Sequence, residues 1–142
     1  MNEVGPQVIL DRQVIEEFRR RESVVKSHGL EKITVALVTT VGAKTGAERI
    51  SPLTYTTEGD DVIVVASDYG SSSHPGWYYN IMANPKVRVE IGAQPYEANA
   101  TILTDGPERQ RLWDDRVRQF PNFKEFQDKT DRLIRVVVLR RN

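Results

Sequence analysis

A short glycine-rich turn carries the residues of this chain that are best suited to bind an anion. Residues 42–46 read GAKTG, and Arg49 follows three residues later. The two glycines allow a tight turn with exposed amide hydrogens, and Lys44 and Arg49 add two positive charges. Taken alone, the same residues also fit an ordinary hairpin loop with solvated charges. The turn is therefore a candidate site for phosphate or carboxylate groups.

A second candidate segment covers residues 66–78, which read ASDYGSSSHPGWY. Here a strand-like run passes through small polar residues into a helix-like run that begins near Pro75. The unpaired amides at the start of a helix attract anions. The alternative interpretation is a plain serine- and glycine-rich connection in which Trp77 anchors the core.

Metal and nucleotide chemistry find little support in the sequence. His28 and His74 are the only histidines, and neither has a second ligand at a metal-binding spacing, so we expect no metal site. The nucleophile-elbow pattern GxSxG and the dinucleotide pattern GxGxxG are missing. The 42–46 turn lacks the full GxxxxGK[ST] pattern and precedes a strand rather than a helix, which excludes a nucleoside triphosphatase.

Composition narrows the class of protein further. The chain has 142 residues, 39% of them hydrophobic, which is enough for one domain with a core. Twenty basic and twenty acidic residues leave no net charge, so a dedicated nucleic-acid binder is not expected. Without cysteine the fold cannot use disulfides or thiolates. With no long apolar run and no signal-like start, we expect a cytoplasmic protein.

Hydrophobic periodicity places the two candidate segments on a mostly β framework. A helical pattern predicts an amphipathic helix over residues 11–28, within an N-terminal region of residues 1–30. Its apolar stripe beside Arg19 to Arg21 would allow peripheral contact with a membrane, although packing on the core is the favoured interpretation. Further helical patterns cover residues 75–83, 105–120 and 122–130.

Alternating and β-branched residues predict strands over residues 33–41, 50–57, 61–67, 87–91, 96–102 and 133–139. The last strand is strongly apolar and should lie centrally in the sheet. Strands joined as hairpins, with helices inserted between them, do not fit a doubly wound parallel sheet. The sequence predicts a mainly β (α+β) fold, a split β-barrel of about six antiparallel strands over residues 31–142.

Three segments in this order resemble the deazaflavin-dependent nitroreductase family, whose members are split-barrel oxidoreductases that bind coenzyme F420. They read LVTTVGAKTGAERISPLTY, VIVVASDYGSSSHPGWYYNIMANPKVRVEI and FPNFKEFQDKTDRLIRVVVL, and they run from about Leu37 to Leu139. They contain a G-x-K-[ST]-G turn followed by R-x-x-P, an A-S pair before H-P-x-W-Y-x-N, and N-P-x-V. The resemblance implies an FMN-binding-like split barrel that transfers a hydride from reduced F420 to an electron-poor acceptor, a quinone in preference to a nitroaromatic.

The resemblance also implies which residues bind the coenzyme. Those matching the part that grips the phosphate- and carboxylate-rich tail are Lys44, Thr45, Gly46, Arg49 and Pro52. Those matching the part that holds the flat ring system are Ala66, Ser67, Asp68, Gly70, His74, Pro75, Trp77 and Tyr78. Asp68 stands where similar enzymes often carry a basic residue, and Ala43 where a second cation is common. We therefore expect a weaker affinity for the tail.

On the acceptor side, the resemblance implicates Phe120, Phe123 and Phe126, which stand where nitroimidazole-reducing members carry tyrosines. Phenylalanine cannot donate a hydrogen bond to a nitro or quinone oxygen, so nitroimidazole reduction is not expected. Ser67, Tyr55 and solvent are candidate proton donors. Two alternatives keep the fold, namely an FMN-dependent split-barrel enzyme and a non-catalytic carrier of a coenzyme or other small molecule. A homodimer is compatible with either interpretation.

Overall fold

The computed structural model describes residue 15 and residues 35–92 and 94–142. The helix predicted over residues 11–28 lies outside the described residues apart from Ile15, which is helical. Within this part, seven antiparallel strands form one sheet in the order β2-β1-β5-β6-β7-β4-β3. The strands are β1 (Val35–Val41), β2 (Glu48–Thr54), β3 (Thr56–Glu58), β4 (Asp61–Val65), β5 (Lys86–Ile91), β6 (Gln94–Leu103) and β7 (Val136–Arg141).

In the part of the chain from residue 35 onward that the structure describes, four helical elements accompany the sheet. They are the 3-10 turn η1 (Asp68–Gly70), α2 (Gly76–Ala83), α3 (Gly106–Gln119) and α4 (Phe123–Asp128). The helix patterns at 75–83 and 105–120 therefore predict α2 and α3 to within one residue at each end. Of the described helices, none is long and apolar enough to cross a membrane.

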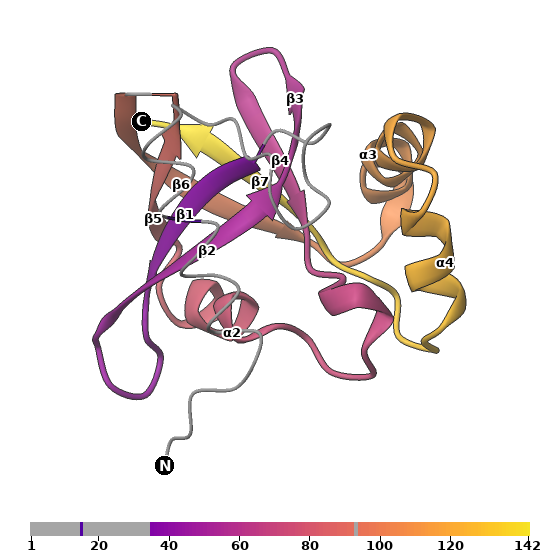
Figure 1. Ribbon diagram of the computed structural model, residues 1–142, viewed down its shortest axis with the longest axis horizontal. Coiled ribbons are helices and arrows are strands. Elements are labelled where there is room, and N and C mark those ends of the chain that lie inside the picture. Colours follow the sequence, from indigo (N-terminus) through magenta and orange to yellow (C-terminus); the bar gives the residue numbers. More distant parts are fainter. Residues whose placement is uncertain (1–14, 16–34, 93) are drawn as a thin grey trace.

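The sheet curls because its two edge strands are neighbours in the sequence. β2 ends at Thr54 and β3 begins at Thr56, so Tyr55 alone joins one edge of the sheet to the other. This gives the curled half-barrel of Figure 1 and confirms the predicted split barrel. The single strand predicted over residues 50–57 is corrected to two strands, because the chain turns the corner of the barrel at Tyr55. The sheet accordingly has seven strands rather than about six.

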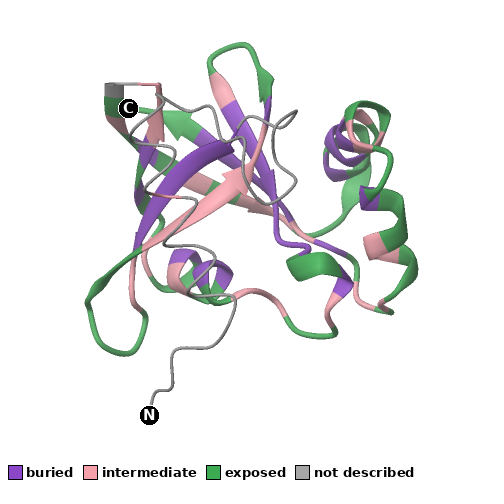
Figure 2. Ribbon diagram, in the orientation of Figure 1, coloured by how far each residue is buried: buried purple, intermediate pink, exposed green. Residues whose placement is uncertain are grey.

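Alternation along β4 gives the sheet two apolar faces. Val62 and Val64 belong to a cluster inside the barrel, together with residues of α2 and of four other strands. Ile63 and Val65 face the other way and belong to a second cluster with residues of α3 and α4. Figure 2 shows buried residues along these strands and on the parts of α2 and α3 that face the sheet. Successive residues of β7 also belong in turn to the two clusters. This strand lies between β6 and β4, which confirms its predicted central position.

The buried stripe of α3 contains two arginines. Arg109 and Arg116 lie one heptad apart, flank Leu112 and Trp113, and are 2% and 1% exposed. Arg109 donates from Nε (3.0 Å) and Nη2 (2.7 Å) to the carbonyl of Ile134. Among the described carboxylates, none forms an ion pair with either arginine.

Arg116 fastens α3 to the corner of the barrel. Its Nη2 donates to the carbonyls of Ile63 (2.8 Å) and Thr54 (3.2 Å). Its guanidinium carbon lies 4.9 Å from the ring centroid of Phe123. Burial lowers the pKa of Arg116 to about 10. The hydrogen bonds to backbone carbonyls thus hold a charged group in the second apolar cluster.

Candidate functional site

Three segments lie along one end of the barrel (Figure 1). They are the hairpin loop between β1 and β2, the start of α2 and the turn η1, and they lie along the lower side of the view in Figure 1. Asn80 of α2 ties the hairpin to this helix. Its Oδ1 accepts a hydrogen bond from the amide of Ala43 at 2.9 Å, and its Nδ2 donates to Thr40 Oγ1 at 3.0 Å. Asn80 is a positioning residue that sequence reasoning did not single out, although it ends the quoted H-P-x-W-Y-x-N motif.

The hairpin loop has a defined conformation of its own. The amide of Gly42 donates to the carbonyl of Ala47 at 2.7 Å, and the amide of Gly46 donates to the carbonyl of Gly42 at 2.9 Å. Thr45 Oγ1 accepts from the amide of Ala47 at 3.1 Å. Gly46 has a φ of +75°, where a side chain would be strained. Thr45 and Gly46 therefore shape the turn.

Lys44 and Arg49 are the exposed cations of this hairpin. Neither forms an ion pair within the described ranges. Arg49 lies opposite Thr40 in the β1–β2 register, and cross-strand partners share a face of the sheet. Arg49 is thus on the face that carries α2. Pro52 is three residues further along and lies opposite Leu37, so it is on the other face.

Arg132 holds the second candidate segment in place. Its Nη1 donates to the carbonyl of Ala66 at 3.0 Å, its Nη2 to the carbonyl of Ser67 at 2.8 Å, and its Nε to the carbonyl of Ser71 at 2.9 Å. Its Nη1 also lies 3.2 Å from His74 Nδ1. One side chain therefore fixes both ends of the loop around η1. Sequence reasoning missed this residue, because about sixty positions separate it from its partners.

His74 lies at the junction of this loop and α2. Its ring stacks on Tyr78 with centroids 4.3 Å apart and meets the edge of Tyr79 at 5.8 Å. Its pKa is lowered by burial and by the positive charges of Arg132 and Arg135. The imidazole is consequently neutral at pH 7.

The inner wall of this region is buried. Ala66, Trp77 and Tyr78 are 0%, 8% and 4% exposed and belong to the cluster inside the barrel. Ser67, two residues after the end of β4, is 8% exposed. Tyr55 is half-buried against the same cluster at the barrel corner, and burial raises its pKa, so its hydroxyl stays protonated at neutral pH.

The η1 turn is held in a left-handed backbone conformation. Asp68, Tyr69 and Gly70 have φ values of 44°, 56° and 84°. Gly70 is buried against α4, and the ring of Tyr69 meets the edge of Phe126 at a centroid distance of 5.7 Å. This contact brings α4 to the candidate coenzyme loop. Backbone strain is concentrated where the loop meets the C-terminal segment.

The three phenylalanines of the C-terminal segment differ in their surroundings. Phe123 is 9% exposed, belongs to the second apolar cluster and lies 5.1 Å from Phe126. Phe120 is partly buried against the same cluster, with its ring 6.2 Å from that of Phe123. Of the three, Phe126 is the one whose ring contacts η1 through Tyr69.

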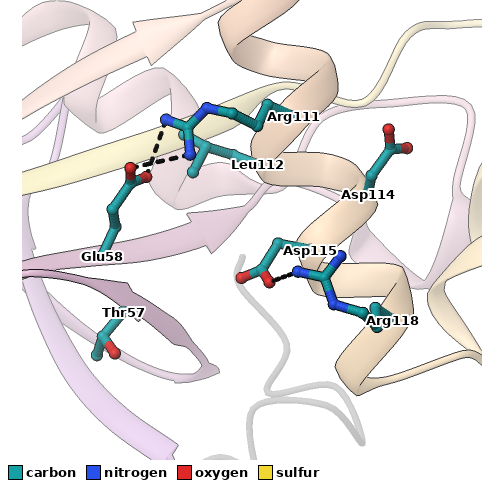
Figure 3. A pocket seen from close by; sticks show the side chains of 7 residues that line it. All are labelled: Thr57, Glu58, Arg111, Leu112, Asp114, Asp115 and Arg118. Carbon is teal, nitrogen blue, oxygen red and sulfur yellow. Dashed lines mark hydrogen bonds and ion pairs between the residues drawn. The ribbon is translucent and has the colours of Figure 1, made fainter.

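A hollow of about 430 Å³ lies elsewhere, between β3 and α3 (Figure 3). Four of its five charged side chains pair with one another: Arg111 contacts Glu58 at 2.9 Å, and Arg118 pairs with Asp115. It is lined by Thr57, Glu58, Arg111, Leu112, Asp114, Asp115 and Arg118. None of the residues implicated from the sequence lines it, so we do not place the functional site there. Within the described residues, no group of three or more His, Asp or Glu side chains could hold a metal ion.

Comparison with known proteins matches the chain to a family. Residues 10–141 match the profile of the F420H(2)-dependent quinone reductase family. An F420H(2)-dependent quinone reductase of Mycobacterium tuberculosis (strain ATCC 25618 / H37Rv) is 37% identical over 110 residues, which cover 74% of this chain and 72% of that protein.

Solved structures agree with this match. One of an F420-H2 dependent reductase has a TM-score of 0.68 and 40% identity, and the comparison covers 74% of this chain and 92% of that one. A domain-swapped dimer has a TM-score of 0.71 and 35% identity, covering 95% and 99% of the two chains. A pyridoxamine 5'-phosphate oxidase from Listeria innocua shares the fold at 13% identity, with a TM-score of 0.55 over 94% of each chain. The chain belongs to the F420H(2)-dependent quinone reductase family.

Proposed function

We propose that this protein is an oxidoreductase that transfers a hydride from reduced coenzyme F420 to a quinone. The observation that supports this most directly is the β1–β2 hairpin. It presents Lys44 and Arg49 without ion-pair partners in the described part of the chain, and Asn80 ties it to the helix that continues the second candidate segment. The coenzyme's tail is polyanionic, so unpaired cations beside exposed backbone amides fit it chemically.

When bound, the reduced deazaflavin supplies the hydride, and the protein supplies binding and orientation. In this proposal Lys44 and Arg49 bind the tail, and Gly46 gives the backbone turn that lets the tail approach. The segment from Ala66 to Tyr78 forms the wall beside the ring, with its shape fixed by Arg132. Tyr55 and Ser67 remain the protein's candidate proton donors for the reduced acceptor. The raised pKa of Tyr55 keeps its hydroxyl able to donate.

For the acceptor we propose a narrower role for the phenylalanines than the resemblance implies. Phe123 is packed in the second apolar cluster and stabilises the attachment of α3 and α4. Phe126, beside Tyr69 and η1, is the better candidate to contact an acceptor. Its apolar ring can stack on a flat quinone but offers no hydrogen bond to a nitro group.

Removing the two hairpin cations tests this proposal. Lys44→Ala combined with Arg49→Ala should weaken F420 binding roughly hundredfold, equivalent to about 3 kcal/mol for two charge-assisted contacts. The matched control removes the same charge from α3 and α4, with Arg118→Ala combined with Lys124→Ala. Binding is measured by absorbance titration. A double variant that binds F420 as tightly as the control variant would contradict the proposed tail site.

Two further assays separate the alternatives. Tighter binding of FMN than of F420 in the same titration would favour an FMN-dependent enzyme. Binding of F420 without oxidation of its reduced form by menadione would favour a non-catalytic carrier. We expect F420 binding with quinone turnover.

We also propose that the protein forms a homodimer. The support is the similar chain that forms a domain-swapped dimer. Light scattering at several protein concentrations should give twice the mass of the 16.2 kDa chain. A mass that stays at that of one chain over this range would contradict the proposal.

A further inference from the structure

The contact between Arg132 and His74 determines where the imidazole carries its proton. Arg132 Nη1 lies 3.2 Å from His74 Nδ1. A guanidinium group has N–H donors and no acceptor. The Nδ1 atom must therefore present its lone pair to Arg132. In a neutral ring the proton is then on Nε2.

The guanidinium cannot easily turn away from this contact. Two of its nitrogens donate to the carbonyls of Ser67 and Ser71, on either side of η1, and Nη1 also donates to the carbonyl of Ala66. Protonation of His74 Nδ1 would place two N–H groups against each other and bring together two positive charges. The three backbone hydrogen bonds thus oppose the rearrangement that a protonated ring would need.

The other groups around His74 also favour the neutral form of its imidazole. Arg135 adds a second positive charge, and the neighbouring rings are those of Tyr78 and Tyr79. The negative charge of Asp68 acts on Arg132. In the described part of the chain, no carboxylate forms an ion pair with the imidazole. The charges that surround the ring favour its neutral form.

We propose that Arg132 is a positioning residue that locks His74 as a neutral Nε2–H donor, and that this N–H binds a carbonyl oxygen of a ring held at the 66–78 segment. The ligand half of the proposal rests on the proposed function, whereas the lock does not. Nε2 lies on the side of the imidazole turned away from Arg132, and it has no hydrogen-bond partner among the described residues. The N–H is therefore available to a bound molecule.

This arrangement makes His74 a hydrogen-bond donor rather than a proton-transfer group. Its Nδ1 is occupied by Arg132, and loss of the Nε2 proton would leave an unstable imidazolate. A neutral imidazole can still stabilise negative charge that develops on an oxygen. The proton for the reduced acceptor must come from another group, and Tyr55, Ser67 and solvent remain the candidates. The carbonyl belongs either to the coenzyme or to the quinone.

Nitrogen NMR of the full chain tests the lock without any ligand. The chain has two histidines, so a His28→Gln background leaves one signal set for His74. We expect protonated Nε2, unprotonated Nδ1 and a titration midpoint below the ordinary value of about 6.5. Arg132→Met should raise the midpoint and mix the tautomers. Arg135→Met is the matched control, because it removes a nearby charge but no contact with the ring, so the tautomer should persist.

Protonated Nδ1 in the otherwise unchanged chain would overturn the lock, and this result does not require the Arg132→Met variant to fold. An unchanged tautomer in a folded Arg132→Met variant would also overturn it. Conversely, failure of the wild type to bind F420 would defeat the proposed function and the ligand role of His74, while the NMR result would still decide the lock.

His74→Phe tests the ligand role, because it keeps an aromatic ring against Tyr78 but removes the donor. If the donor serves the quinone, kcat/KM for menadione should fall roughly hundredfold, as when one donor to a developing oxyanion is removed. If it serves the coenzyme, F420 affinity should fall about fivefold, as for one lost hydrogen bond. His74→Gln should recover part of either loss. A loss in F420 affinity assigns the carbonyl to the coenzyme. A loss in kcat/KM for menadione at unchanged F420 affinity assigns it to the quinone. No change in either quantity overturns the donor role.

Discussion

Replacing Gly70 by alanine should destabilise the fold at the point where the candidate coenzyme loop meets α4. Gly70 has a φ of +84°, and a Cβ atom there would lie 2.6 Å from the carbonyl oxygen of Phe126. It would also lie 3.0 Å from Phe126 Cα and from Lys129 Cβ. Two of these three atoms are backbone, so a side-chain rotation cannot relieve the clash. Either η1 or α4 has to move.

Two contributions determine how far Gly70→Ala lowers the free energy of unfolding. A left-handed backbone costs an alanine about 1–2 kcal/mol, and forcing an extra carbon into packed structure costs about 1–3 kcal/mol. The free energy of unfolding should therefore fall by about 2–5 kcal/mol in Gly70→Ala. Gly59→Ala is the matched control, since Gly59 has a φ of +60° and nothing within 4 Å of its added Cβ. The control should show the first contribution alone.

Urea unfolding of the two variants and the wild type measures both changes. The difference between Gly70→Ala and Gly59→Ala should be about 1–3 kcal/mol, with little change in the denaturant slope. Equal losses in the two variants would refute the inference that Gly70 is required by its close approach to α4. They would leave only the backbone conformation as the reason for glycine at both positions.

Three further predictions concern the buried arginine, the histidine and the acceptor. Arg116→Met loses two hydrogen bonds from a charged group, about 3–6 kcal/mol, but relieves a burial cost of about 3 kcal/mol implied by the lowered pKa. Urea unfolding should therefore show a net loss of about 0–3 kcal/mol, and a gain in stability would contradict this balance. Because the folded pKa of His74 is lowered, the unfolded chain binds more protons below about pH 6.5, and the free energy of unfolding should decrease as the pH is lowered through that window. In His74→Phe this contribution to the pH dependence of the free energy of unfolding should vanish. Urea unfolding of both proteins from pH 5 to 7 measures that dependence. If it is the same for both proteins, the histidine is not its source. Phe126→Tyr should raise turnover of a bicyclic nitroimidazole relative to menadione, and an unchanged ratio would count against contact between Phe126 and the acceptor.

Local patterns in the sequence predict most of the fold, because the barrel is built from neighbouring hairpins. Alternation over residues 61–67 already separates inward from outward residues, and helical spacing identifies α2 and α3. The break at Tyr55 is not visible in this way, since residues on both sides favour strand. It arises only when the two edges of the sheet are brought together. The position of this break therefore depends on contacts between distant parts of the chain that close the sheet.

The candidate site is predictable in its loops but not in what holds them. The GAKTG turn stands out by its glycines and Lys44, the 66–78 segment stands out by its small polar residues before Pro75, and both lie at one end of the barrel (Figure 1). By contrast, Arg109, Arg116 and Arg132 look like ordinary solvated charges in the sequence. A signal exists for the first two, because they share an i, i+3, i+4, i+7 stripe with Leu112 and Trp113. Arg132 offers no comparable local pattern.

These arginines donate hydrogen bonds to backbone carbonyls that the curled sheet leaves without a partner strand. Where strands end or the chain turns a corner, backbone carbonyls have no partner strand, and buried carbonyls require hydrogen-bond donors. Arg116 supplies a donor to the carbonyl of Thr54 at the barrel corner, and Arg132 supplies donors around η1. Each side chain can donate several times, so one residue can fix a whole irregular segment.

The same contacts link the two halves of the proposed site. Arg132 belongs to the C-terminal segment but binds the 66–74 loop, and Gly70 and Tyr69 of that loop pack on Phe126 of α4. A change in the segment proposed to contact the acceptor therefore also alters the wall proposed to contact the coenzyme. Coupling between binding sites is reciprocal, so an acceptor analogue that orders α4 should tighten coenzyme binding by the same factor as the coenzyme tightens binding of the analogue. If both proposed sites are correct, residues of the C-terminal segment should influence both partners of the hydride transfer.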